Sequence, residues 1–167
     1  MTRRTYRAQD VAMFLLAAAD PEDNDISNLK LQKLCYYAQG IISAMRGKAL
    51  FSDSIEAWDH GPVIPSLYHE YKQHGSAPIP TVDDFDAALF DQSDQKALRD
   101  VLEYYGQFSP WRLRNMTHDE PPWTSAYNQE NRRITLDSMV AHFRPVIDDS
   151  YVASIYGEGP TNKAAKT

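Results

Sequence analysis

The histidines and the single cysteine are the residues of this chain with the greatest capacity for catalysis or metal binding. Five histidines stand singly at positions 60, 69, 74, 118 and 142, and none forms an H-E-x-x-H pair. The trio His118-Asp119-Glu120 comes closest to a metal motif, but consecutive side chains point in different directions on any helix or strand. We therefore predict structural or surface histidines, with no bound metal and no cofactor.

No nucleophile is marked by its sequence context. Cys35 follows Leu31 and Leu34 at helical spacing, which predicts a buried thiol that fills the core. Neither G-x-S-x-G nor G-x-x-x-x-G-K-[ST] occurs, so acyl transfer and nucleotide binding have no signature. One enzymatic alternative stays open, a small hydrolase that uses His60 or His118 beside a carboxylate. That alternative requires these side chains to converge in one cleft.

The aromatic residues point instead to recognition of another protein. The chain contains ten tyrosines and three tryptophans, residue types that are enriched at protein interfaces. Most of them are expected to complete the core with their polar atoms in water. Tyr36 is the exception, because helical spacing places it with Gly40 on the side of the helix opposite Leu34 and Cys35. An aromatic beside a glycine on a nominally outer face indicates that something packs there too.

The acidic composition limits the classes of partner. Seventeen Lys plus Arg against 23 Asp plus Glu give a formal net charge of −6, which disfavours binding to nucleic-acid phosphates and to anionic lipid surfaces. The apolar run 11–19 is shorter than the roughly 20 residues that cross a bilayer, and acidic residues follow where a signal peptide would carry its cleavage site. A single cysteine suits a reducing compartment, so we predict a cytoplasmic protein.

Helical periodicity dominates the chain. Helix formers fill 8–19, and the clearest pattern begins at Ser27 and Asn28 and runs to Gly47. The mixed segment 51–60 is left irregular, with a brief extended stretch as the alternative. Further helices are expected from Pro62 or Pro65 to Gly75, from Ser93 or Asp94 to Gly106, from Ser109-Pro110 to Asn115, from Pro122-Trp123, and from Thr135 to Pro145.

These elements predict an all-α or mainly α fold, a single bundle of about five to seven helices without a pattern of alternating strands. Residues 1–156 are expected to form one helical domain, and residues 157–167 have the composition of a flexible tail. The acids Asp83, Asp84 and Asp86 and the pair Asp148-Asp149 are assigned to loops or helix ends, where water solvates them.

Several segments, in order and at regular spacing, resemble the Panacea domain of SocA-like antitoxins. They include SNLKLQKLCYYAQG at 27–40, IEAW at 55–58, GPV at 61–63 and THDEPPW at 117–123. The resemblance covers most of residues 10–145. It departs from the family at Cys35, where a plain aliphatic residue is expected, and this changes packing alone.

The resemblance implies an antitoxin that neutralises a toxin encoded beside it, often on a prophage or another mobile element, by direct protein contact. SocA-like members are also known as proteolytic adaptors, which implies delivery of the toxin to the ClpXP protease as a second mode of action. The residues expected to contact the toxin are Lys33, Tyr36 and Gly40 on the outer face of the helix at 27–47, with Trp58, His60 and Tyr68 in neighbouring motif segments.

A third function class is a DNA-binding antitoxin that represses its own operon. The acidic balance weighs against it, and the sequence contains no basic helix of the helix-turn-helix kind. A salt-dependent shift of promoter DNA would revive this alternative.

Overall fold

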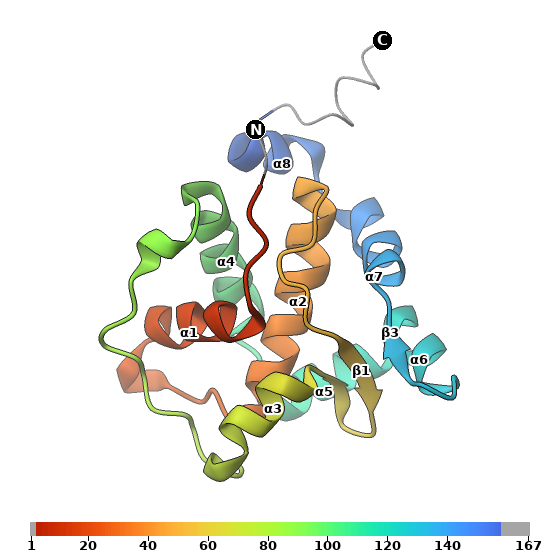
Figure 1. Ribbon diagram of the computed structural model, residues 1–167, viewed down its shortest axis with the longest axis horizontal. Coiled ribbons are helices and arrows are strands. Elements are labelled where there is room, and N and C mark those ends of the chain that lie inside the picture. The colour runs from red at the N-terminus through yellow and green to blue at the C-terminus, as the bar shows by residue number, and fades with distance from the viewer. Residues whose placement is uncertain (1–2, 158–167) are drawn as a thin grey trace.

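The helix α2 (Asn28–Arg46) forms the centre of the computed structural model, which describes residues 3–157 (Figure 1). Ser27 begins the helix, since its Oγ accepts the N–H of Lys30 at 3.3 Å, and Gly47 ends it in the left-handed region with φ 76°. Every residue of α2 except Leu29 and Ile41 is buried. The other elements therefore cover α2 on all sides.

The mainly helical fold class is confirmed, with eight α-helices within residues 3–157 against the five to seven expected. The additional helix, α8, was missed because the pair Asp148-Asp149 was assigned to solvated loops or helix ends. In the structure the Asp148 carboxylate accepts the N–H of Ser150 at 2.8 Å and caps α8. The helices around α2 are α1 (Ala8–Ala18), α3 (Pro65–Tyr71), α4 (Gln92–Tyr105), α5 (Pro110–His118), α6 (Pro121–Tyr127), α7 (Leu136–Phe143) and α8 (Asp149–Tyr156).

The caps expected at Ser109 and Thr135 are confirmed, but the start of α4 differs from the prediction. Asp91 precedes the helix, and Ser93 and Asp94 lie within its first turns. Asp94 cannot cap α4 because its side chain is buried against α2. Beyond Gly157, the expected tail lies outside the described residues. No helix within residues 3–157 combines the length and the apolar character that a membrane crossing requires.

A small antiparallel sheet replaces the irregular segment expected at 51–60 and confirms the alternative of a brief extended stretch there. Its strand order is β2-β1-β3, with β1 at Ile55–Trp58, β2 at Gly61–Val63 and β3 at Arg133–Ile134. Trp58 pairs with Gly61 across the hairpin, and Ile55 pairs with Ile134. Strands of two to four residues are too short to carry a period-2 signal, and β3 joins from a distant part of the chain.

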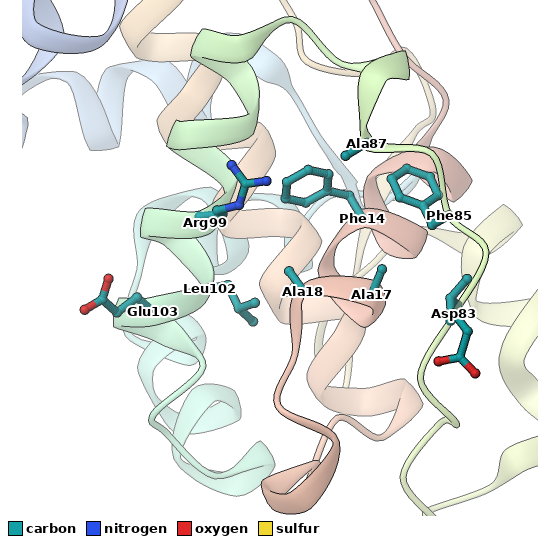
Figure 2. Close-up of a pocket in the computed structure, with 10 residues that line it drawn as sticks. Phe14, Ala17, Ala18, Asp83, Phe85, Ala87, Arg99, Leu102 and Glu103 are labelled. Atoms are coloured by element: carbon teal, nitrogen blue, oxygen red, sulfur yellow. The ribbon is translucent and has the colours of Figure 1, made fainter.

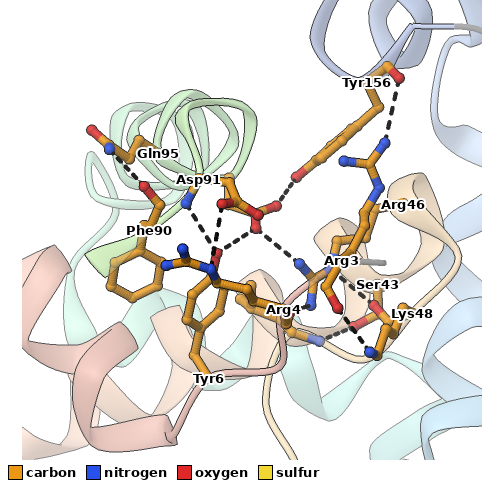
Figure 3. A network of polar contacts seen from close by, with 12 residues as sticks. Arg3, Arg4, Tyr6, Ser43, Arg46, Lys48, Phe90, Asp91, Gln95 and Tyr156 are labelled. Atoms are coloured by element: carbon orange, nitrogen blue, oxygen red, sulfur yellow. Dashed lines mark hydrogen bonds and ion pairs between the residues drawn. The ribbon is translucent and has the colours of Figure 1, made fainter. Parts of the chain in front are cut away.

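A buried ion pair ties α2 to α4 and to both ends of the described chain (Figure 3). Arg46 donates to Asp94 at 2.8 Å, and both side chains are almost fully buried. Asp94 also accepts the hydroxyl groups of Tyr6 at 2.8 Å and Tyr156 at 2.6 Å. Arg46 donates further to the carbonyl groups of Arg4, Lys48 and Ala49. The charges of both partners are thereby satisfied away from water.

Removing one partner of this pair should strongly destabilise the fold. Arg46→Met leaves the Asp94 carboxylate buried without its cation, which we expect to lower the free energy of unfolding by about 3–5 kcal/mol. Urea unfolding followed by circular dichroism measures the change. The double variant R46M/D94L should recover part of the loss, since it buries no uncompensated charge. A single variant as stable as the wild type would contradict a structural role for the pair.

Candidate functional site

The three residues predicted on the outer face of α2 are buried. Lys33 and Tyr36 have an exposed fraction of 0%, and Gly40 is also buried. The predicted exposure was wrong because α5 and α7 pack against this face of α2. A Cβ atom added at Gly40 would lie 2.5 Å from two ring carbons of Phe143 in α7. Glycine is therefore required at position 40 for α7 to pack closely on α2. The Tyr36 ring fills the same contact between the two helices.

Tyr36 and Tyr37 bind one carboxylate. The Tyr36 hydroxyl donates to Glu120 Oε1 at 2.9 Å, and the Tyr37 hydroxyl donates to Glu120 Oε2 at 2.8 Å. Tyr37 also stacks on Tyr105, with ring centroids 3.9 Å apart and an interplanar angle of 10°. Burial raises the pKa of the Glu120 carboxyl to about 7, although the two hydroxyl groups act in the opposite direction. The segment THDEPPW is thus anchored directly to α2.

Lys33 lies where three motif segments meet. Its Nζ is buried without a hydrogen-bond partner among residues 3–157. A Cβ atom added at Gly61 would lie 2.7 Å from Lys33 Cε and 3.0 Å from Thr117 Oγ1. Gly61 has φ 118°, so glycine is required there both by the backbone and by this contact. Burial, and then the charge of Arg114, lower the pKa of the Lys33 amine to about 7.

The turn between β1 and β2 is held by α5 and α6. His118 places Nδ1 2.7 Å from the carbonyl oxygen of Arg114 and Nε2 2.8 Å from that of Asp59. A ring nitrogen that carries a hydrogen donates to the carbonyl oxygen it faces. Trp123 Nε1 donates to the carbonyl oxygen of Trp58 at 2.9 Å, and its ring lies 3.9 Å from that of His118. The hairpin is therefore fixed in one position.

The other three predicted residues lie at the surface around this hairpin. His60 is exposed, while Trp58 and Tyr68 are partly exposed. The Trp58 and Tyr68 rings contact each other edge to face, with centroids 5.1 Å apart. The six predicted residues thus divide into a buried group that positions the hairpin and a surface group that the hairpin presents. Among residues that the prediction left out, Glu120, Gly61 and Trp123 stood in the quoted motifs, whereas no sequence signal marked Arg114.

The hydrolase alternative requires a carboxylate beside His60 or His118, and His118 lacks that partner among residues 3–157. Both ring nitrogens of His118 face backbone carbonyl groups, so neither faces a carboxylate. Within residues 3–157 no group of three metal-ligating side chains comes together. Cys35 is fully buried, and burial raises the pKa of its thiol, which confirms its place in the core.

A groove of about 550 Å³ lies elsewhere, between α1, α4 and the segment 82–87 (Figure 2). Phe14, Ala17 and Ala18 line it from α1, and the Arg99 guanidinium lies 5.4 Å from the Phe14 ring. None of the six predicted residues lines this groove. It is separate from the cluster around the hairpin.

Lys33 and Glu120 should together produce a stability minimum near neutral pH. Between about pH 7 and the usual amine pKa of 10.5, the unfolded state carries a Lys33 proton that the folded state lacks, so the free energy of unfolding rises with pH. Between pH 4.5 and about 7, the folded state holds a Glu120 proton that the unfolded state lacks, so the free energy of unfolding falls as the pH rises. Urea unfolding across this range measures both limbs.

Two variants separate the contributions to this pH profile. Lys33→Met should flatten the alkaline limb, and Glu120→Gln should flatten the acidic limb. Profiles that match the wild type in both variants would show that these groups titrate as they do in water.

Substitutions at Tyr36 should act first on stability. Tyr36→Phe removes only the hydroxyl that donates to Glu120, and we expect a loss of about 1–2 kcal/mol. Tyr36→Ala also empties a fully buried ring site, with an expected loss of about 3–5 kcal/mol. Thermal unfolding of the two variants ranks these effects. If Tyr36→Ala were as stable as the wild type, Tyr36 would not be a core residue, and the prediction that it faces outward would hold.

Comparison with known proteins assigns the chain that carries these motif segments to a family. The model of the family described as antitoxin SocA-like, Panacea domain, matches residues 31–124, more than half of the 167 residues. The protein Antitoxin SocA of Caulobacter vibrioides (strain NA1000 / CB15N) is 43% identical over 68 residues, which cover 41% of this chain and 36% of the relative. The chain thus spans about a third of that relative's length. No solved structure matches the chain. The chain belongs to the family of SocA-like antitoxins that carry the Panacea domain.

Proposed function

We propose that this protein is an antitoxin that neutralises a toxin by direct contact between the two proteins. The observation that carries the proposal is the family match over residues 31–124, which runs from α2 into α6. The similar protein from Caulobacter vibrioides bears the name Antitoxin SocA. The proposal includes a toxin that is made and acts in the cytoplasm of the same cell. Direct contact with that toxin would place this protein in the cytoplasm as well.

The surface proposed for the toxin is the β1–β2 hairpin with the adjoining face of α3, which we call the hairpin surface and define by Trp58, His60 and Tyr68. Tryptophan and tyrosine dominate the binding energy of many interfaces. The carbonyl groups of Trp58 and Asp59 lie within hydrogen-bond distance of Trp123 and His118, so the backbone of the hairpin turn is held before binding. Preorganisation of this kind lowers the entropy cost of association.

In this proposal the buried residues Lys33, Tyr36 and Gly40 have a structural role and do not touch the toxin. Lys33 packs against Gly61 at the end of the hairpin, and Tyr36 holds Glu120 at the start of α6. Substituting them would disturb the toxin interface through the fold. Their role differs from that of the hairpin surface, whose side chains are available to a partner.

Two modes of neutralisation fit the proposal. In the first, the bound antitoxin occludes the surface that the toxin needs. In the second, it presents the toxin to the ClpXP protease. Co-expression with the product of the adjacent open reading frame tests both, because growth rescue with constant toxin indicates occlusion, and rescue with toxin loss that depends on ClpXP indicates delivery.

Substitutions in the hairpin surface should weaken toxin binding without unfolding the protein. Trp58→Ala and Tyr68→Ala are each expected to weaken the affinity at least about 30-fold, the loss that corresponds to a hot-spot residue. Calorimetry on the purified pair measures the affinity. Tyr104→Ala is the matched control, since Tyr104 is a tyrosine on α4 with an exposed fraction of 56%.

The outcomes separate the surface from the function. If all three variants bind as the wild type does, the toxin uses another surface and the antitoxin proposal stands. If the neighbouring product is harmless alone and does not co-purify with the wild type, the antitoxin proposal itself fails.

A further inference from the structure

Helix α5 carries a basic face on an otherwise acidic protein. Its sequence, PWRLRNMTH, contains Arg112, Arg114 and His118 and no carboxylate, whereas the chain as a whole has a formal net charge of −6. Arg112 is exposed and Arg114 is partly exposed. Neither arginine pairs with a carboxylate among residues 3–157. The positive charge of α5 is therefore available to a partner.

An exposed aromatic ring lies on the same helix. Trp111 has an exposed fraction of 60%, and the Arg114 guanidinium lies 4.6 Å from the centroid of its ring. This cation–π contact holds both side chains in a defined arrangement. Tryptophan and arginine are the residue types most enriched at interface hot spots. A ring of this size costs free energy in water unless a partner covers it.

Beneath this surface, two basic side chains have a nitrogen that lacks an acceptor. Lys33 Nζ and Arg114 Nε are buried without a hydrogen-bond partner within residues 3–157. The charge of Arg114 also opposes protonation of Lys33. Buried donors without acceptors are costly, and the charge of Arg114 makes the region electropositive. An anion at the surface of α5 would offset that potential.

We infer that the exposed side of α5, where Trp111 lies between Arg112 and Arg114 around the helix axis, docks an acidic segment of the toxin. We call these three residues the α5 face. Charge complementarity is the argument for the occupant: two arginines without carboxylate partners call for carboxylates, and the exposed Trp111 calls for an apolar side chain beside them. The inference rests on the proposed function for the identity of the partner. It deepens that proposal by giving the chemistry of the toxin surface.

The α5 face and the hairpin surface are joined through His118. This residue ends α5, and its Nε2 lies 2.8 Å from the carbonyl oxygen of Asp59 in the hairpin turn. One toxin can therefore contact both. The α5 face would supply the charged part of the contact, and the rings of Trp58 and Tyr68 its apolar part.

The test is charge reversal at Arg112 with a matched control at Arg99. Arg112→Glu places a carboxylate in the first turn of α5, where the helix dipole favours it, so the fold is retained. Arg99 is also an exposed arginine, but it lies on α4 over the Phe14 ring, beside the groove lined by Asp83 and Glu103 (Figure 2). We expect R112E to weaken toxin affinity at least about tenfold and R99E to leave it within about twofold.

A peptide array of the toxin sequence identifies the docked segment. Overlapping 15-residue peptides should show binding to Asp- and Glu-containing segments, with loss in R112E and after replacement of the peptide acids by Asn and Gln. Equal toxin affinity in wild type, R112E and R99E would overturn the inference while the antitoxin proposal stands. A wild type that binds no toxin would overturn both. If R112E lost only binding to a 30-nucleotide duplex, the α5 face would be a nucleic-acid surface and the inference would be wrong.

Discussion

The complete enclosure of α2 is the constraint on which the rest of this structure depends. A helix of 19 residues that is buried on almost every side must bring polar side chains into the interior with it. Each of these then needs a partner, since an unpaired buried polar group costs free energy. Arg46 obtains its partner from α4, Lys30 from Asp25 and the carbonyl group of Gly106, and Gln32 from the N–H of Ile64. These bonds place the surrounding elements relative to α2.

The motif residues acquire a physical explanation from this arrangement. The polar and aromatic side chains of SNLKLQKLCYYAQG connect α2 to the hairpin, to α5 and to the start of α6. Gln32 binds the backbone just after β2, Tyr36 and Tyr37 bind Glu120, and Lys33 packs on Gly61. The segment that matches the family therefore contains a set of interior connections.

Local chemistry explains which parts of the fold were predictable from sequence. Ser27 and Gly47 mark the ends of α2 by capping and by a left-handed turn, and both signals lie within a few residues of the helix. Helical periodicity could identify the more apolar face of α2 but could not show that the opposite face is covered as well, so Tyr36 was placed outside. The pairing of Arg46 with Asp94 and of β1 with β3 depends on residues far apart in the chain. No local pattern reports such contacts.

The same separation of interior from surface bears on partner choice. Residues that are enclosed cannot discriminate between partners by contact, so discrimination falls to exposed side chains that the interior holds in place. The two proposed contact surfaces, the hairpin surface and the α5 face, would be such places, and His118 links them through two backbone carbonyl groups. A formal charge of −6 describes the whole chain and conceals the basic helix within it. The net charge alone suggests a basic partner, whereas the unpaired arginines of α5 favour an acidic one. Screening limits charge effects to about 8 Å at physiological salt, so the charges near the contact, rather than the net charge, determine which partner is favoured.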